Sequence, residues 1–184
     1  MTDPEAALTG CLLGQALGDA LGFVVEAQPP SVAGEYVKDL RAGRAGRQSH
    51  PEYPFGQYSD DTQLARELLS SFVEAGGWRP EVFAGRLGAL FSQGRDVGAG
   101  PGTRGAAMRL SDGAHWSDAG TPAPYAGNGS AMRAAPLGLL FGDDTRSMVA
   151  AAIEQSSITH RDPRCSAGAL VVAGATRLAA KGTP

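Results

Sequence analysis

Apolar residues recur at helical spacing in one segment after another of this 184-residue chain. Leu64, Leu68 and Phe72 follow that period, whereas the sequence lacks the sustained alternation with β-branched residues that is typical of strands. The pattern predicts an all-α fold, because helices are then the elements left to build the core. The length suits one domain, so we expect residues 1–184 to fold as a single unit.

Prolines, glycines and capping residues predict where the helices begin and end. Pro4 and Pro80 suit the first turn of a helix, and Gly76 with Gly77 suits an end. Residues 31–55 are polar and punctuated by glycine and proline, so we expect an irregular loop there, either functional or a plain surface excursion. Further helices are expected around 106–110, from 127–130 with a kink at Pro136, from Asp144 or Thr145 to Thr159, and from Asp162 onward.

Four glycines lie four residues apart near the N-terminus, at positions 10, 14, 18 and 22. Because glycine is a poor helix former, such a row predicts a close approach by another helix or by a ligand, and close packing is the commoner reason. Gln15 and Asp19 interrupt the apolar run, so we expect no membrane span. Asp3 and Glu5 stand where a signal peptide would carry basic residues, so we expect no signal peptide either.

Charge and cysteine content narrow the class of protein. Lys and Arg number 16 against 19 Asp and Glu, and the net charge of -3 gives no electrostatic reason to bind nucleic acid. Cys11 and Cys165 are too few for a disulfide framework, so we expect reduced thiols and a cytoplasmic location. The 26 glycines do not indicate disorder, because 42% of the residues are hydrophobic and the net charge is low.

Two adjacent carboxylates stand between hydroxyls in the run Ser59-Asp60-Asp61-Thr62, directly before an expected helix. The run has two interpretations. Asp60 with Gln63 three residues later fits a capping box, and capping is the commoner use of such residues at a helix start. Hydroxyl and carboxylate oxygens in a row also suit a hard cation such as magnesium or manganese.

The glycine-rich run from 94 to 105 is similarly open to two interpretations. Backbone amides exposed before a helix can receive phosphate oxygens, but the run is neither a Walker pattern nor a Rossmann fingerprint. A flexible connection is the commoner case for such a composition. His160, beside an expected helix end, is likewise more often structural than functional when taken alone.

Five short motifs follow one another along the chain: residues 10–22 with Glu26, then 59–62, then Asp96-Val97-Gly98, then 127–133, then Thr159-His160. Each motif is weak alone, but their order over nearly the whole chain resembles the ADP-ribosylglycohydrolase family. The resemblance implies an all-helical fold, a compact orthogonal bundle of many helices. It also implies hydrolysis of the N- or O-glycosidic bond between ADP-ribose and a protein side chain, assisted by two divalent cations, Mg2+ or Mn2+.

The resemblance implies roles for the matching residues. The metal ligands would be Ser59, Asp60 and Asp61, and the catalytic residues would be Asp60, Asp61, Asp96 and Glu26. Asp61 would orient or deprotonate the attacking water. Asp96 resembles the aspartate of the branch that acts on ADP-ribosyl-arginine, whereas the alternative for Glu26 is a salt bridge or a loop cap. The residues that would contact substrate are Gly98, Gly100, Gly127, Asn128, Gly129, Ser130 and His160.

One departure from the family pattern matters. Family members carry a second acidic motif of the form Asp-x-Asp-Ser/Thr near the C-terminus, whereas the last acidic residue here is Asp162. Gly142-Asp143-Asp144-Thr145 resembles that motif only superficially and fits a helix cap better. We therefore expect the N-terminal part of a longer domain, a site completed by a second polypeptide, or an ADP-ribose-binding relative without turnover. The partner would be an ADP-ribosylated protein, with arginine favoured, or a small molecule containing ADP-ribose.

Overall fold

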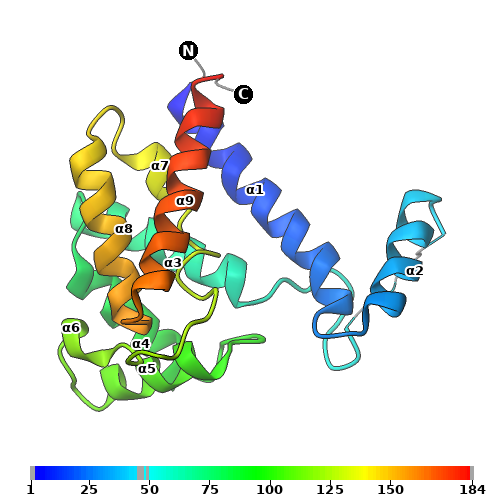
Figure 1. Cartoon of the computed structure of the whole chain (residues 1–184), viewed down its shortest axis with the longest axis horizontal. Coiled ribbons are helices and arrows are strands. Elements are labelled where there is room, and N and C mark those ends of the chain that lie inside the picture. Colours follow the sequence, from blue (N-terminus) through cyan, green and yellow to red (C-terminus); the bar gives the residue numbers. More distant parts are fainter. Residues whose placement is uncertain (1–2, 45–47, 49, 183–184) are drawn as a thin grey trace.

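The computed structural model describes residues 3–44, 48 and 50–182, and these form an all-α fold (Figure 1). Within that part of the chain there is no strand, and one isolated parallel bridge joins Thr121 to His160. The predicted fold class is confirmed. The helices are α1 (Pro4–Gly22), η1 (Phe23–Val25), α2 (Pro30–Arg41), α3 (Asp60–Ala75), α4 (Pro80–Ser92), α5 (Pro101–Ser111), α6 (Trp116–Ala119), α7 (Leu137–Leu140), α8 (Thr145–Thr159) and α9 (Pro163–Ala180).

The core lies between α3, α4, α8 and α9. Leu64 and Leu68 of α3 are fully buried against Phe83 and Leu87 of α4 and Ile158 of α8. Full burial of such a side chain stabilises the fold by about 1.5–3 kcal/mol. Figure 1 shows α1 leaving this core diagonally and α2 standing apart beyond the end of α1. The chain is therefore densely packed around α4 and α8 and thinly packed around α1 and α2.

Most predicted helix ends are confirmed, because local cap chemistry decides them. Pro4 and Pro80 occupy the first turns of α1 and α4, and Gly76 ends α3 in the left-handed conformation at φ 66°. Asp144 caps α8 by accepting from the Ser147 amide at 3.0 Å, and Asp162 caps α9 in the same way.

The irregular loop expected over residues 31–55 is partly wrong, since α2 occupies Pro30–Arg41. Pro30 starts this helix, and Glu35 pairs with Lys38 one turn later at 2.7 Å. Of its apolar residues only Tyr36 is buried. Residues 45–47 and 49 of the expected loop lie outside the described residues.

Two other helices differ from the prediction. The helix expected around 106–110 begins at Pro101, so α5 already includes part of the glycine-rich run. The helix expected from 127–130 is absent: residues 129–133 form turns, and α7 covers only Leu137–Leu140. Pro136 explains the break, because proline disfavours a helical conformation in the preceding residue and offers no amide hydrogen.

The close approach by another helix that was predicted at the α1 glycines is not found among the described residues, whereas the alternative, approach by a ligand, stays a prediction. No atom from elsewhere lies within 4 Å of a Cβ placed on the glycines at 10, 14, 18 or 22, and α1 has no buried residue. A close approach occurs instead at Gly138, where a Cβ would collide with the Ala173 carbonyl, so α7 packs tightly on α9. The row of glycines on α1 therefore faces open space.

By length and composition, one stretch could cross a membrane: Pro4–Val25 has a mean hydropathy of 1.5 over a window only 6% buried. Gln15 and Asp19 therefore do not exclude a span as the sequence argument assumed. Both side chains are used within the fold, since Gln15 bonds to the Asp61 carbonyl at 2.8 Å and Asp19 to the Thr62 hydroxyl at 2.6 Å. The absence of a membrane partner stays a prediction.

Candidate active site

Asp19 at the end of α1 holds the start of α3 in place. Its carboxylate accepts from the Ser59 amide at 3.0 and 3.1 Å, and from the Ser59 hydroxyl at 2.8 Å. It also accepts from the amide and hydroxyl of Thr62, at 3.1 and 2.6 Å. Charge-assisted hydrogen bonds of this kind are the strong ones, so the turn before α3 has one fixed conformation.

The capping box predicted from Asp60 and Gln63 is wrong. The cap of α3 is Ser59, whose hydroxyl accepts from the Asp61 amide at 3.3 Å. Gln63 instead reaches another segment: its amide nitrogen donates to the Arg95 carbonyl at 2.8 Å, and its amide oxygen accepts from the Val97 amide at 2.9 Å. The Asp60 amide donates to the Val97 carbonyl at 2.7 Å. These bonds fix the segment that leads to Gly98 against α3.

The carboxyl groups of Asp60 and Asp61 have raised pKa values. The pKa of Asp60 is raised to about 7, chiefly by burial and then by the neighbouring charges of Asp61 and Glu26. Burial also raises the pKa of Asp61 to about 6, with contributions from Asp19 and Glu26. These effects outweigh the positive end of α3, which favours a negative charge at a helix start. A bound cation would remove the repulsion between these groups.

Three glycines surround His160 on the opposite side of the site. The ring atom Nε2 lies 2.7 Å from a Cβ placed on Gly102 and 3.3 Å from one on Gly127. The ring atom Cε1 lies 2.7 Å from a Cβ placed on Gly129. A side chain at 102 or 129 would thus collide with the imidazole. Glycine at these positions lets the backbone approach the His160 ring closely, because it has no Cβ.

His160 is buried and neutral. Its pKa is lowered to about 4, chiefly by burial and then by the nearby Arg133 cation. The Tyr125 ring stacks on the imidazole with centroids 5.9 Å apart, and the Tyr125 hydroxyl accepts from the Gly102 amide at 3.2 Å. The His160 ring is therefore held by the Tyr125 ring as well as by the glycines around it.

These two groups of residues line one small cavity of about 120 Å³. We call Glu26, Asp60 and Asp61 its acidic side. We call Gly98, Gly100, Gly102, Gly127 and Gly129 with His160 its glycine side. The remaining lining residues are Thr103, Tyr125, Asn128 and Met132. A second cavity of about 340 Å³ lies behind Asp61 and also contacts Glu26; it is lined by Gln15, Gly18, Asp19, Gly22, Phe23, Ser59 and Met132.

The residues present fit only part of a divalent cation site. Oxygen ligands from Asp60 and Asp61 are the right chemistry for magnesium or manganese. The Ser59 hydroxyl donates to Asp19 and accepts from Asp61, which leaves one lone pair. Across the described residues, no group of three or more His, Cys, Asp or Glu side chains could hold a metal ion. Further ligands must come from elsewhere if two cations bind.

The structure gathers most of the predicted site residues but not all. The small cavity is lined by Glu26, Asp60, Asp61, Gly98, Gly100, Gly127, Asn128, Gly129 and His160. Asp96 does not line it, and its carboxylate pairs with Arg104 at 2.8 Å. Ser130 is buried behind it, where its hydroxyl donates to the Cys165 carbonyl at 3.0 Å. Ser59 lines the larger cavity. The catalytic and ligand roles of these residues stay predictions.

Several residues of the site were not predicted. Asp19 anchors the α3 start, and Gly102, Thr103 and Tyr125 line the cavity. Asp19 is a single acid at the end of an otherwise apolar helix, and such a residue indicates a polar partner within the fold. Gly102 stands within the glycine-rich run, whereas no local pattern distinguishes Tyr125 from a surface aromatic.

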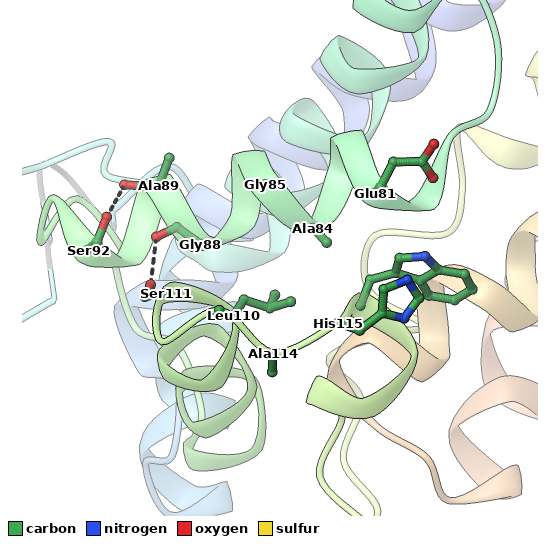
Figure 2. Close-up of a pocket in the computed structure, with 12 residues that line it drawn as sticks. Glu81, Ala84, Gly85, Gly88, Ala89, Ser92, Leu110, Ser111, Ala114 and His115 are labelled. Atoms are coloured by element: carbon green, nitrogen blue, oxygen red, sulfur yellow. Dashed lines mark hydrogen bonds between the residues drawn. The ribbon is translucent and has the colours of Figure 1, made fainter.

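A larger cavity elsewhere lacks such chemistry. Its volume is about 580 Å³, and Figure 2 shows residues that line it, among them Gly85 and Ala89 of α4 and Leu110 of α5. The hydroxyls of Ser92 and Ser111 bond to the carbonyls of Ala89 and Gly88, at 3.3 and 3.4 Å. Glu81 is its one acidic residue. Size therefore does not mark the functional site here, and the small acidic cavity is the better candidate.

Comparisons with known proteins point to one family. A family model described as ADP-ribosylglycohydrolase matches residues 1–184. ADP-ribosylarginine hydrolase Tri1 of Pseudomonas putida is 32% identical over 167 residues, which are 85% of this chain and 43% of that protein. ADP-ribosyl-[dinitrogen reductase] glycohydrolase of Rhodospirillum rubrum is 30% identical over 169 residues, 89% of this chain and 54% of that protein.

Comparison with solved structures points to the same family. A solved structure of an ADP-ribosylglycohydrolase-related protein complex matches with a TM-score of 0.77 and 27% identity. The match covers 100% of this chain and 59% of the other. The chain spans about half the length of the curated relatives it matches.

Proposed function

Since the chain belongs to the ADP-ribosylglycohydrolase family, we propose that it serves the hydrolysis of the glycosidic bond between ADP-ribose and a modified protein side chain, with arginine as that side chain. Two relatives support the substrate class by name, an ADP-ribosylarginine hydrolase and an ADP-ribosyl-[dinitrogen reductase] glycohydrolase. The ADP-ribosylated protein is then the partner of this chain.

One observation carries the proposal: the buried Asp60 and the half-buried Asp61 line the same small cavity as the glycine side. At about 120 Å³ this cavity is below the roughly 300 Å³ of a site that encloses a whole small ligand. It suits the ribose next to the bond that breaks, with the rest of ADP-ribose outside. Hydrolysis at an anomeric carbon commonly uses two carboxyl groups close to the bond that breaks, and Asp60 and Asp61 supply two such groups on one side of this cavity.

The chemistry can be assigned to the residues of this chain. Water adds to the anomeric carbon as the bond from that carbon to the arginine nitrogen breaks. The Asp61 carboxylate takes the proton of the water, since its raised pKa of about 6 suits a base near neutral pH. That proton then passes to the leaving guanidine, so ADP-ribose and arginine are the products. Asp60 stabilises the positive charge that develops on the ribose ring.

A divalent cation bound at this site would be held by Asp60 and Asp61. It would supply a positive charge that orients the ribose hydroxyls and lowers the pKa of a bound water. The missing ligands have a place to enter, because the cavity of about 340 Å³ behind Asp61 opens between the end of α1 and Met132. We propose that they come from a further segment of the domain or from a second polypeptide that packs on the exposed side of α1.

A second candidate function is binding of ADP-ribose without turnover. It is favoured by the incomplete set of metal ligands among the described residues. The glycine side does not depend on those ligands, and it alone could hold a nucleotide sugar.

Release of ADP-ribose from an arginine-ADP-ribosylated protein distinguishes the two candidates. We expect release by the purified chain, or by the chain with its completing polypeptide, with magnesium or manganese and none after chelation. Calorimetric binding of ADP-ribose without release under the same conditions would establish the second candidate. If the protein neither releases nor binds ADP-ribose, both candidates are contradicted. The intact mass of the native protein shows whether a second polypeptide is bound.

A further inference from the structure

Arg133 is a fully buried cation behind the glycine side. Its Nε donates to the Gln155 side-chain oxygen at 2.6 Å. Its Nη2 donates to the Gln155 carbonyl at 2.6 Å and to the Thr159 hydroxyl at 2.9 Å. The guanidinium carbon lies 5.1 Å from the centroid of the Phe83 ring. Both hydrogens of Nη2 are therefore assigned, and one of them goes to Thr159.

The direction of the next hydrogen bond follows from this one. Guanidinium can only donate, so the Thr159 oxygen must accept from Arg133. The Thr159 side chain is fully buried, and its own hydrogen needs an acceptor. Within the described part of the chain, the one acceptor recorded for that hydrogen is Nδ1 of His160, at 2.9 Å. Thr159 therefore donates to the imidazole.

The other protonation states of His160 are less favourable. A hydrogen on Nδ1 would point at the Thr159 oxygen and would leave the buried hydroxyl hydrogen without an acceptor. A doubly protonated ring would place a second cation beside Arg133 in a buried site. The remaining form is the neutral ring with its hydrogen on Nε2.

We propose that Arg133 and Thr159 hold His160 in the neutral form with the hydrogen on Nε2, so that the ring donates one hydrogen bond to a substrate oxygen. Nε2 is the ring nitrogen that faces Gly102 and Gly127 in the small cavity. In this form Nε2 has no free lone pair and does not act as a base. Arg133 and Thr159 are positioning residues, and His160 is the residue that touches the substrate.

The recipient of this hydrogen bond is an oxygen acceptor of ADP-ribose. A ribose hydroxyl and a diphosphate oxygen share this chemistry. The role toward substrate rests on the proposed function, whereas the protonation state of the ring does not. The two claims are therefore tested separately.

The protonation state is tested by long-range proton–nitrogen NMR on the whole chain with labelled histidine. The His160 signals are identified by their loss in His160→Gln. We expect wild-type Nε2 to carry the hydrogen and Nδ1 to have the shift of a bare, hydrogen-bonded nitrogen. Thr159→Ser should keep this pattern, because the hydroxyl remains, and Thr159→Val should lose the fixed tautomer. A hydrogen on Nδ1 in the wild type overturns the proposal, whether or not any variant folds.

The role toward substrate is tested by calorimetry with ADP-ribose and with ADP. Loss of one hydrogen bond predicts that Thr159→Val binds ADP-ribose about tenfold more weakly, and Thr159→Ser within about twofold of wild type. Weaker binding of both ligands identifies a diphosphate oxygen, whereas weaker binding of ADP-ribose alone identifies a ribose hydroxyl. Unchanged binding of both in folded Thr159→Val would overturn the donor role. Absence of binding in the wild type would contradict the proposed function instead, with the NMR result unaffected.

Discussion

The two sides of the small cavity differ in how completely this chain builds them. On the glycine side, His160 is stacked on Tyr125, bonded to Thr159 and enclosed by Gly102 and Gly129. On the acidic side, Asp60 and Asp61 repel one another and Glu26. Behind the acidic side α1 is open, whereas behind the glycine side lie the buried contacts of Arg133.

The difference shows which part of the site is self-sufficient. The groups that would hold a neutral or anionic substrate have their partners within the chain. The groups that would hold a cation do not, because no group of three or more His, Cys, Asp or Glu side chains in the part of the chain that the structure describes could hold a metal ion. The proposed substrate contacts and the proposed metal ligands thus lie on different sides of the cavity, and variants on the two sides should have different effects.

The largest effect is expected from the acidic side. Asp61→Asn removes the base and Asp60→Asn removes a charge that stabilises the ribose cation, so either change should lower the turnover rate about 10²–10⁴-fold. ADP-ribose binding through the glycine side should change much less. Rates of ADP-ribose release and calorimetry measure the two properties. Asp112→Asn, at an exposed carboxylate, serves as the control and should match wild type. Full turnover in both cavity variants would contradict the assigned roles.

A rise in pH is expected to lower the free energy of unfolding by about 3 kcal/mol. Because the folded-state pKa values of Asp60 and Asp61 lie above the ordinary 3.8, their stabilising contribution is full below about pH 4. It is lost as pH rises through 6 and 7, with the two acids titrating as a pair. The free energy of unfolding without metal should therefore fall between pH 4 and pH 8.

Chemical denaturation at several pH values measures this fall. In the double variant Asp60→Asn/Asp61→Asn the extra loss should be absent, and magnesium should restore part of the stability of the wild type at pH 8. An equal pH dependence in wild type and double variant would show that the acidic side is already neutralised.

On the glycine side, Gly102→Ala should lower the free energy of unfolding by about 1–3 kcal/mol. The added methyl would contact Nε2 of His160 at 2.7 Å and collide with the Tyr125 ring. Gly100→Ala is the matched control two residues away, because nothing lies within 4 Å of its Cβ and its φ of -70° is ordinary. Equal stability of the two variants would mean that the glycine side has room to adjust.

The smallest effect concerns α1, behind the acidic side. Gly14→Ala should raise the free energy of unfolding of the isolated chain by about 0.5–1 kcal/mol, because alanine favours a helix and no atom lies within 4 Å of the new methyl. Gly138→Ala should do the opposite, since its Cβ would collide with the Ala173 carbonyl. Destabilisation by Gly14→Ala would show that this face of α1 is covered in solution.

Local chemistry explains what the sequence could predict. The starts of α8 and α9 were correctly predicted at Asp144 and Asp162, because a capping side chain acts within three residues of its own position. The sequence does not predict α2, because the helix has a weak apolar pattern. In keeping with this, Val32 and Val37 are each 47% exposed. No helix among the described residues approaches the α1 glycines, because a row of glycines encodes small side chains and not the partner that would pack on them. Approach by a ligand stays a prediction.

Long-range partners explain what the sequence could not predict. Gln63 fits a capping box by spacing, but the carbonyl of Arg95 and the amide of Val97 bind its side chain instead. Asp19 meets Ser59 across 40 positions of sequence, and no local pattern encodes that contact. The motif order nevertheless identified nine of the residues that line the cavity, because those motifs are spread over both of its sides.

The Gln63 side chain also has a mechanical consequence. Its two hydrogen bonds and that of the Asp60 amide join α3 to the irregular segment 95–98, which carries Gly98. At this end the acidic and glycine sides thus behave as one rigid part, and the gap between them has a set width. If the proposed sugar substrate binds here, it has to fit that width, since the cavity cannot close around it at this end. The Gln63→Asn side chain, shorter by one methylene, would change the width.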